Sequence, residues 1–121
     1  MYMAMNDPAH LDLVLGALAD PTRRAILARL AMGAATVSEL AAPFDMAQPS
    51  ISRHLKVLED AGLIARGRDA QRRPRTLVVG GPLREVDAWL GPFREQWNRR
   101  LDRLESLLEA KQRRGKKPGS S

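Results

Sequence analysis

The sequence predicts a mainly helical fold, with about five helices and one two-stranded β-hairpin. Three observations lead to this prediction. Residues 36–62 have the pattern of a short helix, a tight turn and a second helix. Residues 64–79 contain two short stretches with β-branched residues around a polar, basic tip. On both sides of these segments, apolar residues recur at the spacings of three and four that mark helices.

Two helices are predicted before residue 36, and each begins with an Asp-Pro pair. The aspartate is an N-cap and the proline fits the first helical turn, at Asp7-Pro8 and again at Asp20-Pro21. Gly33 is expected to end the second helix in a left-handed conformation. The first helix has one apolar face, formed by Leu11, Val14, Leu15 and Leu18.

The helix-turn-helix pattern has clear start and stop signals. Thr36 and Glu39 match a capping box, in which each side chain accepts a hydrogen bond from the other residue's amide. Pro43 keeps this helix short, because proline disrupts a helix interior. Pro49 must lie in the first turn of the next helix, so that helix is expected to begin near Gln48. Its preceding residue is alanine, which leaves the helix start without a side-chain cap.

The second helix of the pair has one apolar face and one polar face. Ile51, Leu55 and Leu58 are spaced to face the core. Gly62 is the expected C′ residue, with Leu63 packing back on the helix in a Schellman ending. A major groove accepts a helix of this kind, and arginine or glutamine can read base edges there. The candidate DNA-binding residues on this helix are Gln48, Ser50, Ser52, Arg53, His54 and Lys56.

The hairpin completes a winged helix-turn-helix pattern. Its strands are predicted over Ile64 to Arg68 and Arg75 to Val79. Arginines on or beside the tip could contact phosphates or enter a minor groove, although surface arginines also serve solubility alone. The candidate DNA-binding residues of the wing are Arg68, Arg72, Arg73 and Arg75.

Charge is concentrated where this interface is predicted. The chain of 121 residues has a net charge of +6 and a pI of about 10.7. Residues 1–47 contain three basic and five acidic side chains, whereas residues 48–75 contain seven basic and three acidic ones. A basic surface of this kind favours a polyanionic partner, chiefly nucleic acid.

A long helical pattern follows the hairpin, with a predicted break or kink at Gly91-Pro92. So small a domain is not expected to cover this whole apolar stripe, and a two-fold homodimer would bury it. The alternative is a helix that only closes its own core. We expect one domain over residues 1–112 and a polar, disordered tail over 113–121. The predicted dimer interface, on the first and last helices, comprises Leu11, Val14, Leu15, Leu90, Phe93, Trp97, Leu101, Leu104 and Leu108.

Several other function classes find no support in the sequence. The chain has no cysteine, and His10 and His54 lack ligand-like spacing, so neither a metal site nor a cofactor is expected. Ser50, Ser52 and His54 do not face one another on a helix, so an enzyme is not expected. No apolar run reaches the roughly 20 residues of a membrane span, and no signal-peptide pattern is present. The protein is therefore expected to work in the cytoplasm.

Three segments together resemble a known family: residues 18–30 (LADPTRRAILARL), 36–41 (TVSELA) and 52–64 (SRHLKVLEDAGLI). They are similar to the arsenic-repressor (ArsR-type) family of bacterial winged-helix regulators, over roughly residues 11–108. The resemblance implies a homodimeric repressor that leaves its operator when a signal arrives. The best-known metal sensors of that family have a Cys-x-Cys where this chain has Leu40-Ala-Ala-Pro43. The resemblance is thus to a branch without the metal-binding cysteines.

The sequence therefore predicts a dimeric, metal-independent transcriptional regulator that binds double-stranded DNA at a pseudo-palindromic operator. The inducer is not identified. Two alternatives stay open: a winged-helix module that binds a protein partner, and a DNA-binding protein without sequence preference.

Overall fold

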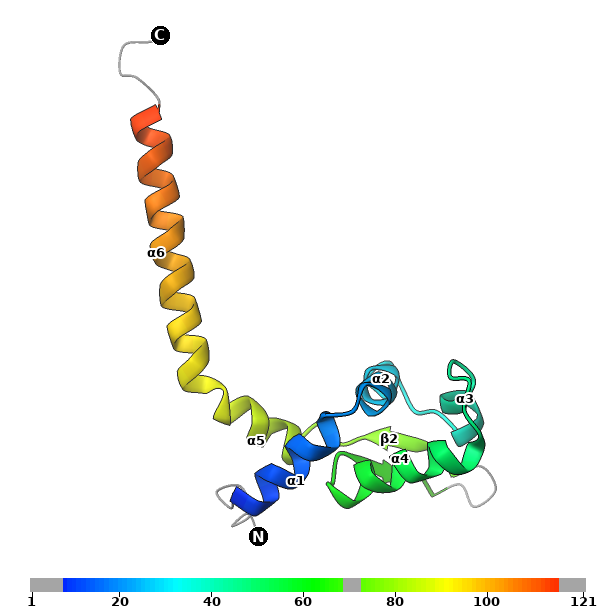
Figure 1. Cartoon of the computed structure of the whole chain (residues 1–121). Coiled ribbons are helices and arrows are strands. Elements are labelled where there is room, and N and C mark those ends of the chain that lie inside the picture. Colours follow the sequence, from blue (N-terminus) through cyan, green and yellow to red (C-terminus); the bar gives the residue numbers. More distant parts are fainter. Residues whose placement is uncertain (1–7, 69–72, 116–121) are drawn as a thin grey trace. The chain divides into compact units, whose positions relative to one another are not determined.

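The computed structural model describes residues 8–68 and 73–115, and it confirms a mainly helical fold with one hairpin (Figure 1). The chain divides into two compact units, Met1–Val86 and Asp87–Ser121. In chain order the elements are α1 (Pro8–Leu18), α2 (Pro21–Leu30), α3 (Val37–Ala41), α4 (Gln48–Asp60), β1 (Ile64–Arg66), β2 (Arg75–Leu77), α5 (Pro82–Trp89) and α6 (Gly91–Gly115).

The helix starts follow the predicted capping signals. The side chain of Asp20 accepts a 3.0 Å hydrogen bond from the amide of Arg23, which caps α2. At α3, the Glu39 amide donates to the Thr36 hydroxyl oxygen at 3.2 Å, and the Thr36 amide donates to the Glu39 carboxylate at 3.1 Å. The predicted capping box is therefore confirmed. Asp7 lies outside the described residues.

The end of α4 is a Schellman motif, as predicted. The Gly62 amide donates to the Glu59 carbonyl at 2.9 Å, and the Leu63 amide donates to the Leu58 carbonyl at 3.0 Å. Gly62 has a φ of +75°, in the left-handed region that glycine adopts without strain. Gly33 also has a positive φ, but its value of +143° is far from the left-handed helical conformation, and α2 is capped by a right-handed Ala31.

The hairpin is shorter than the sequence indicated. Three residues of each strand pair in antiparallel register, from Ile64 opposite Leu77 to Arg66 opposite Arg75. Beyond the ladder, the Gly67 amide still donates to the Pro74 carbonyl at 2.6 Å. Ala35 forms an isolated bridge with Arg75, with amide-to-carbonyl hydrogen bonds in both directions. The loop-side end of the β1–β2 ladder is thus fastened to the segment that precedes α3.

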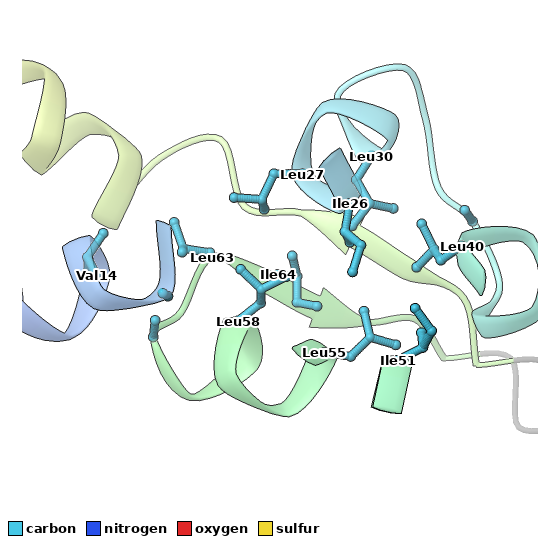
Figure 2. Close-up of a cluster of buried hydrophobic side chains, with 13 residues drawn as sticks. Val14, Ile26, Leu27, Leu30, Leu40, Ile51, Leu55, Leu58, Leu63 and Ile64 are labelled. Atoms are coloured by element: carbon cyan, nitrogen blue, oxygen red, sulfur yellow. The ribbon is translucent and has the colours of Figure 1, made fainter. Parts of the chain in front are cut away.

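One hydrophobic core holds the first unit together (Figure 2). Its side chains come from α1, α2, α3, α4 and β1. Val14 of α1 is fully buried in this core, so it does not lie on the surface where the dimer interface was predicted. Leu11 is half-buried, and Leu15 is 37% exposed. The largest fully buried side chains are Ile26, Leu40, Ile51, Leu55, Leu58, Leu63 and Val14.

The C-terminal helices separate where Gly91-Pro92 predicted a break: α5 ends at Trp89 and α6 begins at Gly91. The helix α6 continues to Gly115, three residues into the segment expected to be a tail, and residues 116–121 lie outside the described part. None of the 25 residues of α6 is buried in the chain. Its exposed apolar residues are Phe93, Trp97, Leu101, Leu104, Leu107 and Leu108.

Neither α6 nor any other helix in the described residues has the length and hydropathy that a membrane span requires. Within the second unit, the rings of Trp89 and Phe93 pack with centroids 4.9 Å apart. An ion pair joins Asp87 and Arg94 at 2.9 Å across the break between the two helices.

Candidate nucleic-acid interface

The helix α4 presents a polar face because its apolar face is used completely in the core. Ile51, Leu55 and Leu58 are at most 1% exposed. The exposed face contains four of the predicted DNA-binding residues: Gln48, Ser52, Arg53 and Lys56. Ser50 and His54 are half-buried at its edges. The start of α4 has no side-chain cap, as Ala47 predicted.

Two cations on this face differ in their freedom. Lys56 donates a 2.9 Å hydrogen bond to Asp60 one turn later, and both side chains are more than half exposed. Such a surface pair contributes little and opens readily. Among the described residues, no hydrogen bond or ion pair engages the side chain of Arg53. Arg53 is exposed, and a guanidinium is suited to a base edge or a phosphate.

His54 lies between α4 and the start of α2. Its Nδ1 is 3.3 Å from Nη1 of Arg23 and 3.8 Å from the carboxylate of Asp20. Only 20% of its side chain is exposed. The hydrogen bond that Asp20 accepts from the Arg23 amide holds the pKa of that carboxyl below its usual value of 3.8, with His54 and the Arg23 guanidinium acting in the same direction. The imidazole thus contacts protein groups, and its position depends on α2.

The predicted wing arginines do not all lie on the surface. Arg68 and Arg73 are exposed, and Arg73 has a positive φ of 39°. Arg72 lies outside the described residues. Arg75 is 7% exposed, and its Nη1 donates to the Arg73 carbonyl. The guanidinium of Arg75 is held inside the protein, so it does not contribute to the exposed basic surface.

The partner of Arg75 is Glu59, near the end of α4. Its carboxylate accepts from Nε of Arg75 at 2.9 Å and from Nε of Arg66 at 3.1 Å. One carboxylate therefore joins α4 to both strands of the hairpin. Sequence reasoning missed Glu59, Arg66 and Arg23, although Glu59 is one of only three acidic residues in the basic segment 48–75.

The remaining chemistry in the described residues offers little for a metal ion. No group of three or more His, Cys, Asp or Glu side chains in this part of the chain could hold one. Glu85 is buried, and its Oε2 lies 3.1 Å from Nε2 of His10, which ties α5 to α1.

Comparisons with known proteins agree with this geometry. A family model described as a helix-turn-helix domain matches residues 18–66. The HTH-type transcriptional regulator Rv2034 of Mycobacterium tuberculosis is 49% identical over 99 residues, which cover 82% of this chain and 89% of that protein. A crystal structure of an ArsR family transcriptional regulator is 47% identical, with a TM-score of 0.66, and the match covers 74% of this chain and 97% of that one.

The chain belongs to the ArsR family. The transcriptional repressor SdpR of Bacillus subtilis is a further relative, 43% identical over 61 residues that cover 50% of this chain and 68% of that protein. The predicted winged helix-turn-helix fold of this ArsR-family chain is thereby confirmed. The protein is a DNA-binding transcriptional regulator, and its relatives are regulators and repressors, which are not enzymes.

Proposed function

We propose that this ArsR-family protein is a dimeric repressor that binds a pseudo-palindromic operator in the cytoplasm without needing a metal ion. The observation that carries the proposal is the division of α4 into a buried apolar face and an exposed polar one. A helix with this division can enter a major groove while its other side stays fixed to the core.

Base reading is assigned to the first turns of α4. Arg53 can donate two hydrogen bonds to O6 and N7 of guanine, and Gln48 can pair with N6 and N7 of adenine. Ser50, Ser52 and Lys56 suit phosphates or mixed base edges, and His54 lies at the flank. On the wing, Arg68, Arg72 and Arg73 complete the proposed DNA-binding set. Their role is to contact the backbone or a minor groove.

The apolar stripe of α6 supports the homodimer. Side chains such as Phe93 and Trp97 are 44% and 51% exposed in the single chain, which is unfavourable for so many large apolar groups in one stripe. A two-fold axis would place the same stripe of two copies together and set two α4 helices about 34–36 Å apart, one DNA turn. The proposed interface comprises Leu11, Leu15, Leu90, Phe93, Trp97, Leu101, Leu104 and Leu108.

Metal independence rests on the donor set of the chain. The helix before the turn contains Leu40 and alanines where thiolate ligands would be required, and the whole sequence has no cysteine. Repression by this protein should therefore not respond to thiophilic metal ions.

The deciding experiment is capture of genomic fragments by the purified full-length protein, followed by titrations of the best fragment and a shuffled duplex at several salt concentrations. We expect a palindromic motif bound at least about 10³-fold more tightly than shuffled DNA. Weak binding with a steep salt dependence and no motif would indicate non-specific binding. Absence of DNA binding, together with a salt-insensitive protein complex, would favour a protein-interaction module.

A further inference from the structure

Arg23 of α2 completes the C-terminal end of α1. Its Nε donates to the Ala17 carbonyl at 2.6 Å and its Nη2 donates to the Gly16 carbonyl at 3.1 Å. The last carbonyls of a helix have no partner within it, and they favour a nearby cation. The last turn of α1 contains no basic residue of its own. The cation that satisfies this helix end therefore comes from α2.

The same guanidinium also reaches the recognition helix. Its Nη1 lies 3.3 Å from Nδ1 of His54. A guanidinium only donates, so a hydrogen bond between these two groups makes Nδ1 the acceptor and places the imidazole proton on Nε2. One side chain thus joins the end of α1, the start of α2 and the middle of α4.

We propose that Arg23 is a positioning residue, which sets the orientation of α4 for operator reading by linking Nδ1 of His54 to the end of α1. The proposal rests on the proposed operator-binding function. Its chemical requirement is an acceptor at Nδ1. The other charged group facing this nitrogen is Asp20, whose carboxylate is 3.8 Å away and would attract the imidazole if Nδ1 carried a proton.

Arginine is needed here for its shape. Three acceptors in different directions require a planar fork of N–H donors, whereas the ammonium of lysine is a compact point charge. Arg23→Lys therefore keeps the charge and removes the three-way contact. Arg24 offers a matched control. Its Nη1 donates to the Leu18 carbonyl of the same helix end at 2.8 Å, and this contact does not involve His54.

The first test compares binding of the captured genomic fragment with binding of a shuffled duplex. We expect Arg23→Lys to lower the ratio of the two affinities about tenfold or more, and Arg24→Lys to leave it unchanged. The slope of log affinity against log salt should stay the same, because Arg23 neutralises no phosphate in this proposal. An equal loss on both duplexes with a slope reduced by about 0.9 would identify a phosphate contact instead and overturn the proposal.

The second test needs no DNA, so it separates this proposal from the proposed function. The chain has two histidines, and His10→Gln identifies the signals of His54 in nitrogen-15 NMR spectra. At about pH 8 we expect an unprotonated Nδ1 and a protonated Nε2 in wild type, and a mixture of tautomers in Arg23→Lys. A protonated Nδ1 in wild type would overturn the link, whatever the DNA titrations show. A wild type that binds both duplexes equally would overturn the proposed function alone.

Discussion

Glu59 on the recognition helix accepts a 2.9 Å hydrogen bond from Arg75 on β2, and these side chains are only 17% and 8% exposed. The contact fixes the hairpin to α4, since Arg66 of β1 pairs with the same carboxylate. Arg75, which was predicted to contact DNA, thus stabilises the elements that carry the proposed DNA-binding surface.

Loss of the Glu59 charge should destabilise the fold. Glu59→Gln leaves the buried Arg75 cation without its counter-charge, and we expect a cost of about 1–3 kcal/mol in the free energy of unfolding. Urea denaturation measures it. The control is Asp60→Asn, which removes the exposed partner of Lys56 and should cost at most about 0.5 kcal/mol. Equal losses of unfolding free energy in the two variants would contradict the role of Glu59 in joining α4 to the hairpin.

Two glycines should respond to alanine with opposite signs. Gly62→Ala places a Cβ 3.3 Å from Pro82 at a φ of +75°, so we expect a loss of about 1–2 kcal/mol. Gly16→Ala lies within α1 with no atom within 4 Å of the new Cβ, so we expect a gain of about 0.5–1 kcal/mol. Thermal unfolding of both variants checks the pair, and a Gly62→Ala variant as stable as wild type would contradict the requirement for glycine at this helix end.

The charge of Asp20 should stabilise the protein only above acidic pH. Its pKa is held below 3.8 in the folded state, so the stabilisation is complete above the unfolded value and is lost as pH falls through the folded one. Asp20→Asn keeps an N-cap and removes the charge. The difference in urea midpoint between wild type and this variant should shrink as pH falls through the acidic range in which the folded-state Asp20 carboxyl takes up its proton. Asp12→Asn, which removes an exposed carboxylate of α1, is the control for the change of net charge.

A charge in the α6 stripe should dissociate the dimer. Trp97→Glu would place a carboxylate inside the proposed interface, and the mass measured by light scattering should fall to that of one chain. Ser106→Glu adds the same charge on the opposite face of the helix and should leave the dimer intact. A dimer that survives Trp97→Glu would show that the interface lies elsewhere.

The exposed cations of α4 should differ in what they recognise. Arg53→Ala should weaken operator binding by about 1–3 kcal/mol and affect shuffled DNA less, because a bidentate guanine contact depends on sequence. Lys56→Ala should weaken binding to both duplexes similarly and reduce the salt slope by about 0.9. Fluorescence anisotropy of labelled duplexes measures both. If Arg53→Ala also acts on both duplexes alike, Arg53 is a phosphate contact.

The features that were predicted correctly depend on residues close in sequence. The capping box joins Thr36 and Glu39 within one turn, and the Schellman ending at Gly62 uses its immediate neighbours. Residue type and spacing are sufficient for such motifs, because the backbone geometry of a helix end is nearly fixed. The same holds for the buried face of α4, whose period gave Ile51, Leu55 and Leu58.

The features that sequence reasoning missed depend on partners far along the chain. Arg75 and Glu59 are 16 positions apart, and Arg23 and His54 are 31 apart. A count of basic residues predicts that a surface has a positive charge. It does not predict which of the cations is paired with a buried carboxylate. Val14 was assigned to the dimer face because its helix has a wide apolar stripe, and only packing against the core decides which edge of the stripe is buried.

Both tryptophans of the chain are in the C-terminal helices: Trp89 is 48% exposed and Trp97 is 51% exposed. Because both indoles lie in the second unit, the tryptophan emission of this protein, excited selectively, reports on that unit. An unlabelled sample can therefore show self-association by a blue shift on concentration, as the indoles leave water, while DNA is read through a separate dye. Self-association and DNA binding can then be followed in the same sample, the first by tryptophan emission and the second by the dye on the DNA.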